Sequence, residues 1–120
     1  MKNIEVEKIE KKLDEFIAAR DWEQFHSVKN LAMALSVETS ELLEIFQWMK
    51  EEESNKLVAS PEVKAKVAEE IADIFIYLSR IAKKAEIDIN EAVFKKMEKN
   101  QGKYPEDKAR GNAKKYTELG

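Results

Sequence analysis

The stretch SPEVKAKVAEEIADIFIYLSRIAKKA, residues 60–85, decides the fold that the sequence predicts. It begins with Ser60, a residue type common at helix N-caps, followed by Pro61, which suits the first helical position, and Glu62, whose charge complements the helix dipole. Apolar residues then recur on one helical face, at Val63, Val67, Ile74, Tyr77 and Ile81. The stretch therefore predicts one long amphipathic helix.

Three further helices are predicted on either side of this stretch. They cover about 4–19, about 27–50, and a segment from near Asp88 or Asn90 to about Asn100. Between and after them, EEESNK at 51–56 is interpreted as a solvated connection and 101–120 as a tail. Because glycine and proline are scarce and helix-favouring residues abundant, we expect an all-α bundle of about four helices, in a single domain over 1–120.

The overall charge excludes some partners. Acidic and basic residues number 24 and 21, so the net charge of -3 provides no basic field for a nucleic-acid backbone. We therefore expect no nucleic-acid polymer as a partner. The absence of cysteine excludes disulfides and thiolate metal sites.

The hydropathy pattern predicts a cytoplasmic protein without a membrane partner. The N-terminus, MKNIEVEKIEKKLDEF, lacks the apolar run of a signal peptide. The most apolar stretch, IADIFIYL at 71–78, is far shorter than the roughly 20 residues that cross a bilayer, and it contains Asp73.

Two of the predicted helices carry carboxylates within their apolar stripes. Around the helix over 27–50, with about 100° between successive residues, Glu38 projects to the middle of the stripe and Glu41 about 60° to one edge. The helix over 60–85 repeats the pattern, with Glu70 at the centre and Asp73 about 60° to one side. Each helix thus directs two acids toward apolar surroundings.

Four acids in such surroundings require a compensating positive charge. An unpartnered buried carboxylate is costly, and crowding several together raises their pKa values until some are protonated. Oxygen ligands without histidine or cysteine favour Mg²⁺ or Mn²⁺ over zinc. The alternative interpretation, that the acids pair with lysines of a neighbouring helix or flank a loosely packed stripe, stays open at this point.

These residues resemble a known family. ETSE at 38–41 and EIAD at 70–73 resemble the E-x-x-E…E-x-x-D signature of the MazG-like all-α NTP pyrophosphatases. Between Phe16 and Leu119 the chain looks closely similar to the dCTP pyrophosphatases, in the segments DWEQFH (21–26), KNLAMAL (29–35), ELLEIFQW (41–48), EEIADIFIYL (69–78) and KYTEL (115–119).

The resemblance implies both an architecture and an activity. The bundle is expected to be completed by a partner subunit, in a homo-oligomer that is commonly a tetramer built as a dimer of dimers. The implied activity is Mg²⁺-dependent hydrolysis of a deoxynucleoside triphosphate, dCTP or a close analogue, to the monophosphate and pyrophosphate, in control of nucleotide pools.

The resemblance also assigns site residues. The metal ligands are expected to be Glu38, Glu41, Glu70 and Asp73, and Glu41 is the catalytic candidate for orienting or deprotonating water, although the pattern leaves the base unassigned. The resemblance places Trp22 and Trp48 near the base, and Asn100 and Tyr104 match positions that related enzymes use around the substrate. From the residues themselves, His26 could hydrogen-bond the substrate near the Trp22 turn, Tyr77 could touch the sugar or be core, and Lys96 and Lys103, with Asn100 and Tyr104, could receive the triphosphate. Gln101 and Gly102 stand where relatives often have basic residues, which puts the phosphate contacts of this turn in doubt.

Two other functions are compatible with the pattern. A non-catalytic helical oligomerisation or partner-binding module would use the acids to specify helix pairing and would bind no Mg²⁺. A related all-α pyrophosphatase could act on another nucleotide, such as dUTP or phosphoribosyl-ATP, because the carboxylates bind metal and phosphate and do not read the base.

Overall fold

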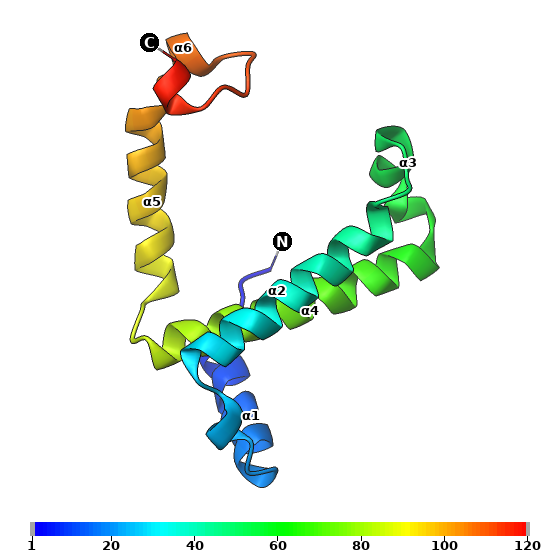
Figure 1. Cartoon of the computed structure of the whole chain (residues 1–120), viewed down its shortest axis with the longest axis vertical. Coiled ribbons are helices and arrows are strands. Elements are labelled where there is room, and N and C mark those ends of the chain that lie inside the picture. The colour runs from blue at the N-terminus through cyan, green and yellow to red at the C-terminus, as the bar shows by residue number, and fades with distance from the viewer. Residues whose placement is uncertain (1, 120) are drawn as a thin grey trace. The chain divides into compact units, whose positions relative to one another are not determined.

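The computed structural model describes residues 2–119, which form helices and turns and contain no β-strand (Figure 1). The helices are α1 (Val6–Ala19), α2 (Val28–Phe46), α3 (Glu51–Asn55), α4 (Pro61–Lys84), α5 (Ile89–Lys103) and α6 (Glu106–Ala109), with 3₁₀ turns η1 (Glu23–Phe25), η2 (Leu57–Ala59) and η3 (Tyr116–Glu118). The predicted all-α class is confirmed. Within the described residues, no helix is both long and apolar enough to span a membrane.

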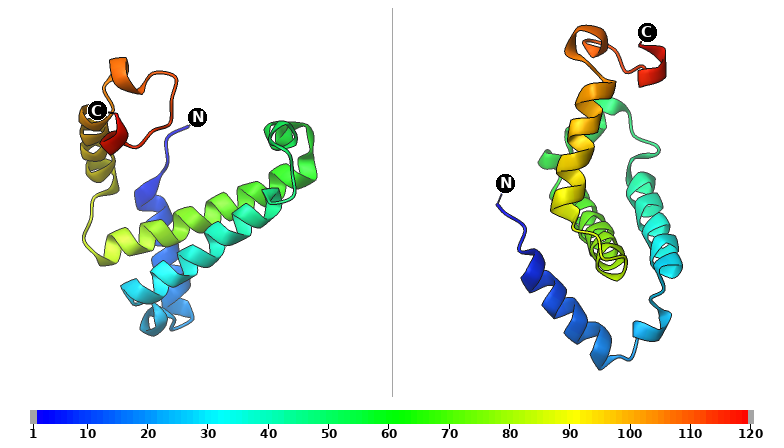
Figure 2. Two further views of the ribbon diagram at one scale, coloured as in Figure 1. Left: turned by 45° about the horizontal axis from the view of Figure 1, so that its top comes forward. Right: turned by 90° about the vertical axis from the view of Figure 1, so that its left-hand side faces the viewer.

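The chain separates into two compact units, residues 1–86 and 87–120. In the first unit, α2 and α4 pack along each other in opposite directions, joined by α3 and η2 (Figure 2). Its apolar side chains that are more than nine-tenths buried are few: Ile17, Leu31, Val67 and Ala82. The α2–α4 pair is therefore the frame that positions the candidate site.

The N-termini of the two long helices are stabilised differently. Ser27 caps α2, because its hydroxyl accepts a hydrogen bond of 3.0 Å from the backbone N–H of Asn30. Ser60 occupies the N-cap position of α4 as predicted, but its side chain makes no capping hydrogen bond. The start of α4 relies instead on Pro61 in the first turn and Glu62 near the positive end of the dipole.

Several helix boundaries differ from the sequence prediction. The first helix begins at Val6 rather than near residue 4, and the second ends at Phe46, before residue 50. Residues 51–55, expected to be a loop, form α3, whose first turn holds Glu51, Glu52 and Glu53. Three carboxylates at a helix N-terminus interact favourably with the helix dipole. The polarity of EEESNK alone does not indicate this interaction.

The second unit consists of α5 and the segment that follows it. The helix is capped by Asp88, which accepts from the N–H of Glu91, and it extends to Lys103, three residues beyond the prediction. The ring of Tyr116 lies edge-on to that of Tyr104, with centroids 6.3 Å apart, and 4.6 Å from the Lys103 ammonium nitrogen. Tyr116 thus contacts the end of α5, while the tail over 101–120 and the single domain over 1–120 stay predictions.

Candidate functional site

Three of the four predicted carboxylates meet where α2 packs on α4. Glu38 and Glu41 come from one side of α2 and Glu70 from α4, and one carboxylate oxygen of each lies within 4.8 Å of the others. The Oε2 atoms of Glu38 and Glu70 are buried and accept no hydrogen bond. The i, i+3 spacing on α2 and the α2–α4 packing together produce this cluster.

The cluster is electrostatically strained. Burial raises the pKa of Glu38 from its ordinary value of 4.5 to about 7, helped by the adjacent carboxyl groups of Glu70 and Glu41 and by the charge of Asp73. Within the described residues, ion pairs to lysine or arginine involve other acids, namely Glu5, Asp14, Glu23 and Glu91. Within residues 2–119, therefore, the four predicted carboxylates form no ion pair with lysine, contrary to the alternative interpretation.

The donor set fits a hard divalent cation. Three carboxylates supply oxygen ligands, and two of their buried oxygens have no other partner. Asp73 is not part of the three-residue group; it lies three residues after Glu70 on α4 and lines the adjacent cavity.

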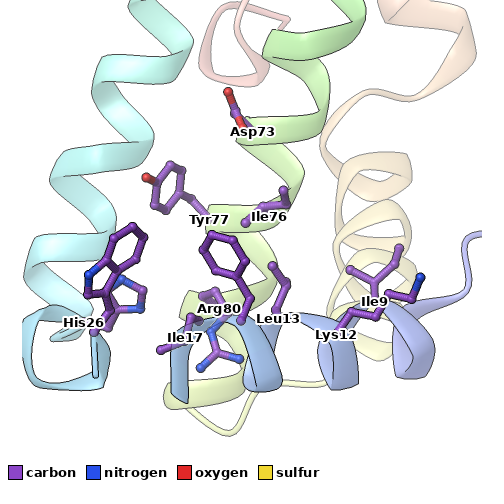
Figure 3. A pocket seen from close by; sticks show the side chains of 11 residues that line it. Ile9, Lys12, Leu13, Ile17, His26, Asp73, Ile76, Tyr77 and Arg80 are labelled. Atoms are coloured by element: carbon purple, nitrogen blue, oxygen red, sulfur yellow. The ribbon is translucent and has the colours of Figure 1, made fainter. Parts of the chain in front are cut away.

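That cavity has a volume of about 490 Å³ and lies between α1, the η1 turn and α4 (Figure 3). Its α4 wall is formed by residues at i, i+3, i+4 and i+7, which are Asp73, Ile76, Tyr77 and Arg80. This face extends about 10 Å along the helix axis. The same face of α4 therefore carries Asp73 and the residues that line the mostly apolar cavity.

Tyr77 lies between the two parts of the site. Burial raises the pKa of its phenol, and the negative charges of Glu38 and Asp73 add to the effect. Its hydroxyl therefore stays protonated and available as a hydrogen-bond donor beside the carboxylates.

Of the two predicted base contacts, Trp22 and Trp48, the structure brings one to the cavity, together with His26. Trp22 and His26 line it, and the Trp22 ring packs edge-on against Phe16 with centroids 5.7 Å apart. The Nδ1 atom of His26 is buried without a hydrogen-bond partner. Trp48 follows the end of α2, is 90% exposed and does not line the cavity.

The predicted triphosphate contacts belong to the second unit. Lys96 and Asn100 are exposed and share a face of α5, while Lys103 and Tyr104 are half-buried at its end, beside Tyr116. Their contact with the phosphates stays a prediction.

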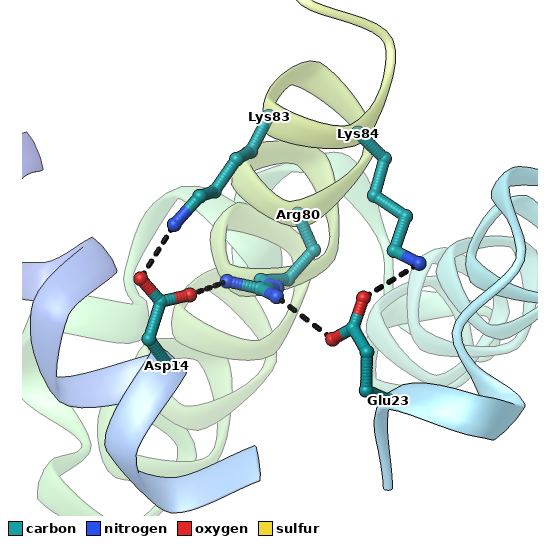
Figure 4. Close-up of polar contacts among 5 residues, drawn as sticks. All are labelled: Asp14, Glu23, Arg80, Lys83 and Lys84. Carbon is teal, nitrogen blue, oxygen red and sulfur yellow. Dashed lines mark hydrogen bonds and ion pairs between the residues drawn. The ribbon is translucent and has the colours of Figure 1, made fainter. Parts of the chain in front are cut away.

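The sequence interpretation missed a buried cation in the cavity wall. Arg80 is 4% exposed and pairs with Asp14 of α1 and Glu23 of η1, while Lys83 and Lys84 bind the same two acids from outside (Figure 4). Its position seven residues after Asp73, on the same face of the helix, was the available signal. The partners could not be found by local spacing, because they lie 66 and 57 residues away.

Comparisons with known proteins find relatives that are similar in sequence and one that is also similar in structure. Among curated relatives, "dCTP pyrophosphatase 1" of Bos taurus is 47% identical and that of Homo sapiens 45% identical, each over 105 residues. Each match covers 88% of this chain and 62% of the relative, so the chain spans about three-fifths of the length of these proteins.

A protein of known structure is also similar to this chain. A pyrophosphatase from Archaeoglobus fulgidus DSM 4304 is 43% identical, with a TM-score of 0.78 over 88% of this chain and 96% of the other. The model of the MazG-like family matches residues 33–119, which include all four predicted metal ligands. The chain therefore belongs to the MazG-like family.

Proposed function

We propose that this protein hydrolyses a deoxynucleoside triphosphate to the monophosphate and pyrophosphate, with dCTP or a close analogue among its best substrates. The observation that carries the proposal is the three-carboxylate cluster formed between α2 and α4, together with an aromatic-lined cavity whose wall includes Asp73, three residues after Glu70 on α4. The names of the similar proteins, dCTP pyrophosphatase and pyrophosphatase, support this choice of reaction and base.

The carboxylates would hold Mg²⁺, with Mn²⁺ as a substitute. Glu38, Glu41 and Glu70 supply the clustered oxygens, and Asp73 adds a fourth carboxylate from the cavity wall. When bound, the cation would offset the charge of the triphosphate and polarise its α-phosphoryl group.

The bond cleaved would be the one between the α-phosphorus and the oxygen that bridges it to the β-phosphorus. The oxygen of a water molecule attacks the α-phosphorus, the bridging oxygen leaves with pyrophosphate, and a proton of the water passes to a carboxylate. We assign this proton to Glu41.

The cavity would receive the base. Stacking on Trp22 is worth about 1–3 kcal/mol by general experience with aromatic platforms. The unpartnered Nδ1 atom of His26 and the Tyr77 hydroxyl are the polar groups that would contact the base and sugar. Trp48, 90% exposed, stays a proposed base contact, and Lys96, Asn100, Lys103 and Tyr104 stay proposed phosphate contacts.

We further propose that the active form is a homo-oligomer, a tetramer arranged as a dimer of dimers, acting in the cytoplasm on the nucleotide pool. Large apolar side chains of the long helices support assembly, because Met33, Val37 and Leu43 of α2 and Ile71 of α4 are all more than half exposed. A partner subunit would cover such surface.

A nucleotide panel tests the function. Purified protein is incubated with Mg²⁺ and each dNTP and NTP in turn, and monophosphate and pyrophosphate are quantified. We expect equal amounts of both products, with dCTP among the fastest substrates and no turnover in EDTA. Preference for dUTP or another nucleotide would change the substrate assignment, and absence of turnover with every nucleotide would overturn the proposal.

A further inference from the structure

Arg80 is a charged side chain in the cavity wall, and as a cation it cannot be a metal ligand. It lies on the face of α4 that carries Asp73, about 10 Å further along the helix, and is 4% exposed. A buried arginine is costly unless its charge is paired, and removing one partner of such a pair is strongly destabilising. The residues that pair with Arg80 therefore indicate which segments of the chain Arg80 holds against α4.

Its two partners belong to α1 and η1, whose neighbouring residues line the rest of the cavity. Nη1 donates to Asp14 of α1 at 2.6 Å, and Nη2 donates to Glu23 of η1 at 3.4 Å (Figure 4). The same contacts hold the pKa of Asp14 and of Glu23 below their ordinary values, with Lys83 the larger cause at Asp14 and Lys84 at Glu23. Both terminal nitrogens thus bind protein carboxylates.

The other contacts of the η1 turn are mostly with nearby residues of the chain: the backbone N–H of Trp22 donates to the carbonyl of Ile17 at 3.1 Å, and the Trp22 ring packs on Phe16. None of the residues of η1 is buried, and Asp21, just before the turn, has a φ of 52°, in the left-handed region. The Asn30 side chain donates to the carbonyl of Phe25 at one end of the turn, and Glu23, next to Trp22, is anchored to α4 at the other. The ion pairs of Glu23 therefore join the Trp22 end of the turn to α4.

We propose that Arg80 is a positioning residue for the base. By holding Asp14 and Glu23 against α4, it closes one end of the cavity and fixes the Trp22 wall before a nucleotide binds. The inference rests on the proposed function for its substrate. Preorganisation of this kind improves binding, whereas the chemistry would take place at the carboxylate cluster of α2 and α4.

The kinetic test compares Arg80→Met, which keeps much of the length and removes the charge, with Lys83→Met. Lys83 is a matched control, because it binds the same Asp14 from the surface. We expect Arg80→Met to raise KM for dCTP about tenfold or more, the scale of losing a stacking wall, with kcat changed less than about threefold. Lys83→Met should leave both within about threefold. Equal effects of the two variants, or a fall in kcat with KM unchanged, would overturn the proposal.

A second readout needs no catalysis. In a Trp48→Phe background Trp22 is the sole tryptophan, so acrylamide quenching of the ligand-free protein reports how firmly the turn is held. Quenching should increase in Arg80→Met and not in Lys83→Met. Glu23→Gln, at a half-exposed position, should increase it as well, and it replaces Arg80→Met if that variant does not fold.

Unchanged quenching in Arg80→Met and Glu23→Gln, or increased quenching with no rise in KM, would overturn the inference. Absence of nucleotide turnover in the unmutated protein would instead refute the proposed function, and the quenching experiment would still decide whether Arg80 fixes the turn.

Discussion

Glu38 is the residue at which a metal site and a structural ion pair predict opposite results. Glu38→Gln keeps the size of the side chain and removes one negative charge. In a buried ion pair this change would strand a cation and cost about 3–5 kcal/mol of stability. In the carboxylate cluster it relieves repulsion, so we expect the metal-free variant to be at least as stable as the unmutated protein.

Melting curves in EDTA and in millimolar Mg²⁺ measure both effects. Mg²⁺ should raise the Tm of the unmutated protein by binding the folded state, and the increment should shrink in Glu38→Gln. Glu44→Gln is the control, since Glu44 lies on the same helix and is exposed. A large loss of stability of Glu38→Gln in EDTA, or an increment equal to that of Glu44→Gln, would contradict the metal site.

The raised pKa of Glu38 also predicts how metal-free stability depends on pH. Between its ordinary value of 4.5 and about 7, the folded protein keeps the Glu38 proton that the unfolded chain releases. Stability should therefore fall as pH rises through this window and level off above it. The lowered pKa values of Asp14 and Glu23 act in the opposite direction, below their ordinary values of 3.8 and 4.5.

Tm measured in EDTA from pH 5 to 8 checks this prediction. The decline should be steeper in the unmutated protein than in Glu38→Gln, which has no group to titrate at this position. Parallel curves for the two proteins would show that another group causes the dependence.

At the scale of elements, the two serines at helix starts predict different costs. Ser27→Ala removes the hydroxyl that accepts from Asn30, and loss of such a cap costs about 1 kcal/mol. Ser60→Ala should cost less, because the Ser60 side chain makes no capping bond. Urea unfolding of both variants measures the difference; an equal loss would show that the hydroxyl of Ser27 does not stabilise α2.

At the scale of elements, the features that the sequence predicted correctly are those that local periodicity determines. The bounds of α4 agree with the sequence to about one residue, because Pro61 and a clear apolar stripe define it. The same periodicity identified the facing acids, of which Glu38, Glu41 and Glu70 do cluster. Helix α3 was not predicted, because a run of charged residues is as typical of a loop as of a short helix whose first turn carries acids.

The rest of the candidate site depends on contacts between distant segments. The placement of Asp73 in the cavity wall, and of α1 and η1 against α4, follows from tertiary packing that spacing does not encode. Arg80 is the clearest case, since an arginine near the end of a helix normally suggests a solvated side chain. Trp48, which the family resemblance placed near the base, is 90% exposed, and its contact with the base stays a prediction.

At the scale of the whole molecule, the exposed apolar surface predicts self-association. We expect light scattering at micromolar concentration to give the mass of at least a dimer. Ile71→Asp, at a position 56% exposed on α4, should lower that mass, because a charge at an apolar interface is costly. Lys66→Asp, on an exposed part of the same helix, is the control. A monomeric mass for the unmutated protein would refute the oligomer.

The central claim is that water attacks the α-phosphorus of a nucleoside triphosphate at the carboxylate cluster. Hydrolysis of dCTP with Mg²⁺ in ¹⁸O-labelled water, followed by mass spectrometry of the products, tests it most directly. We predict one ¹⁸O atom in dCMP and none in pyrophosphate. Label in pyrophosphate, release of dCDP with inorganic phosphate, or no turnover would contradict the claim.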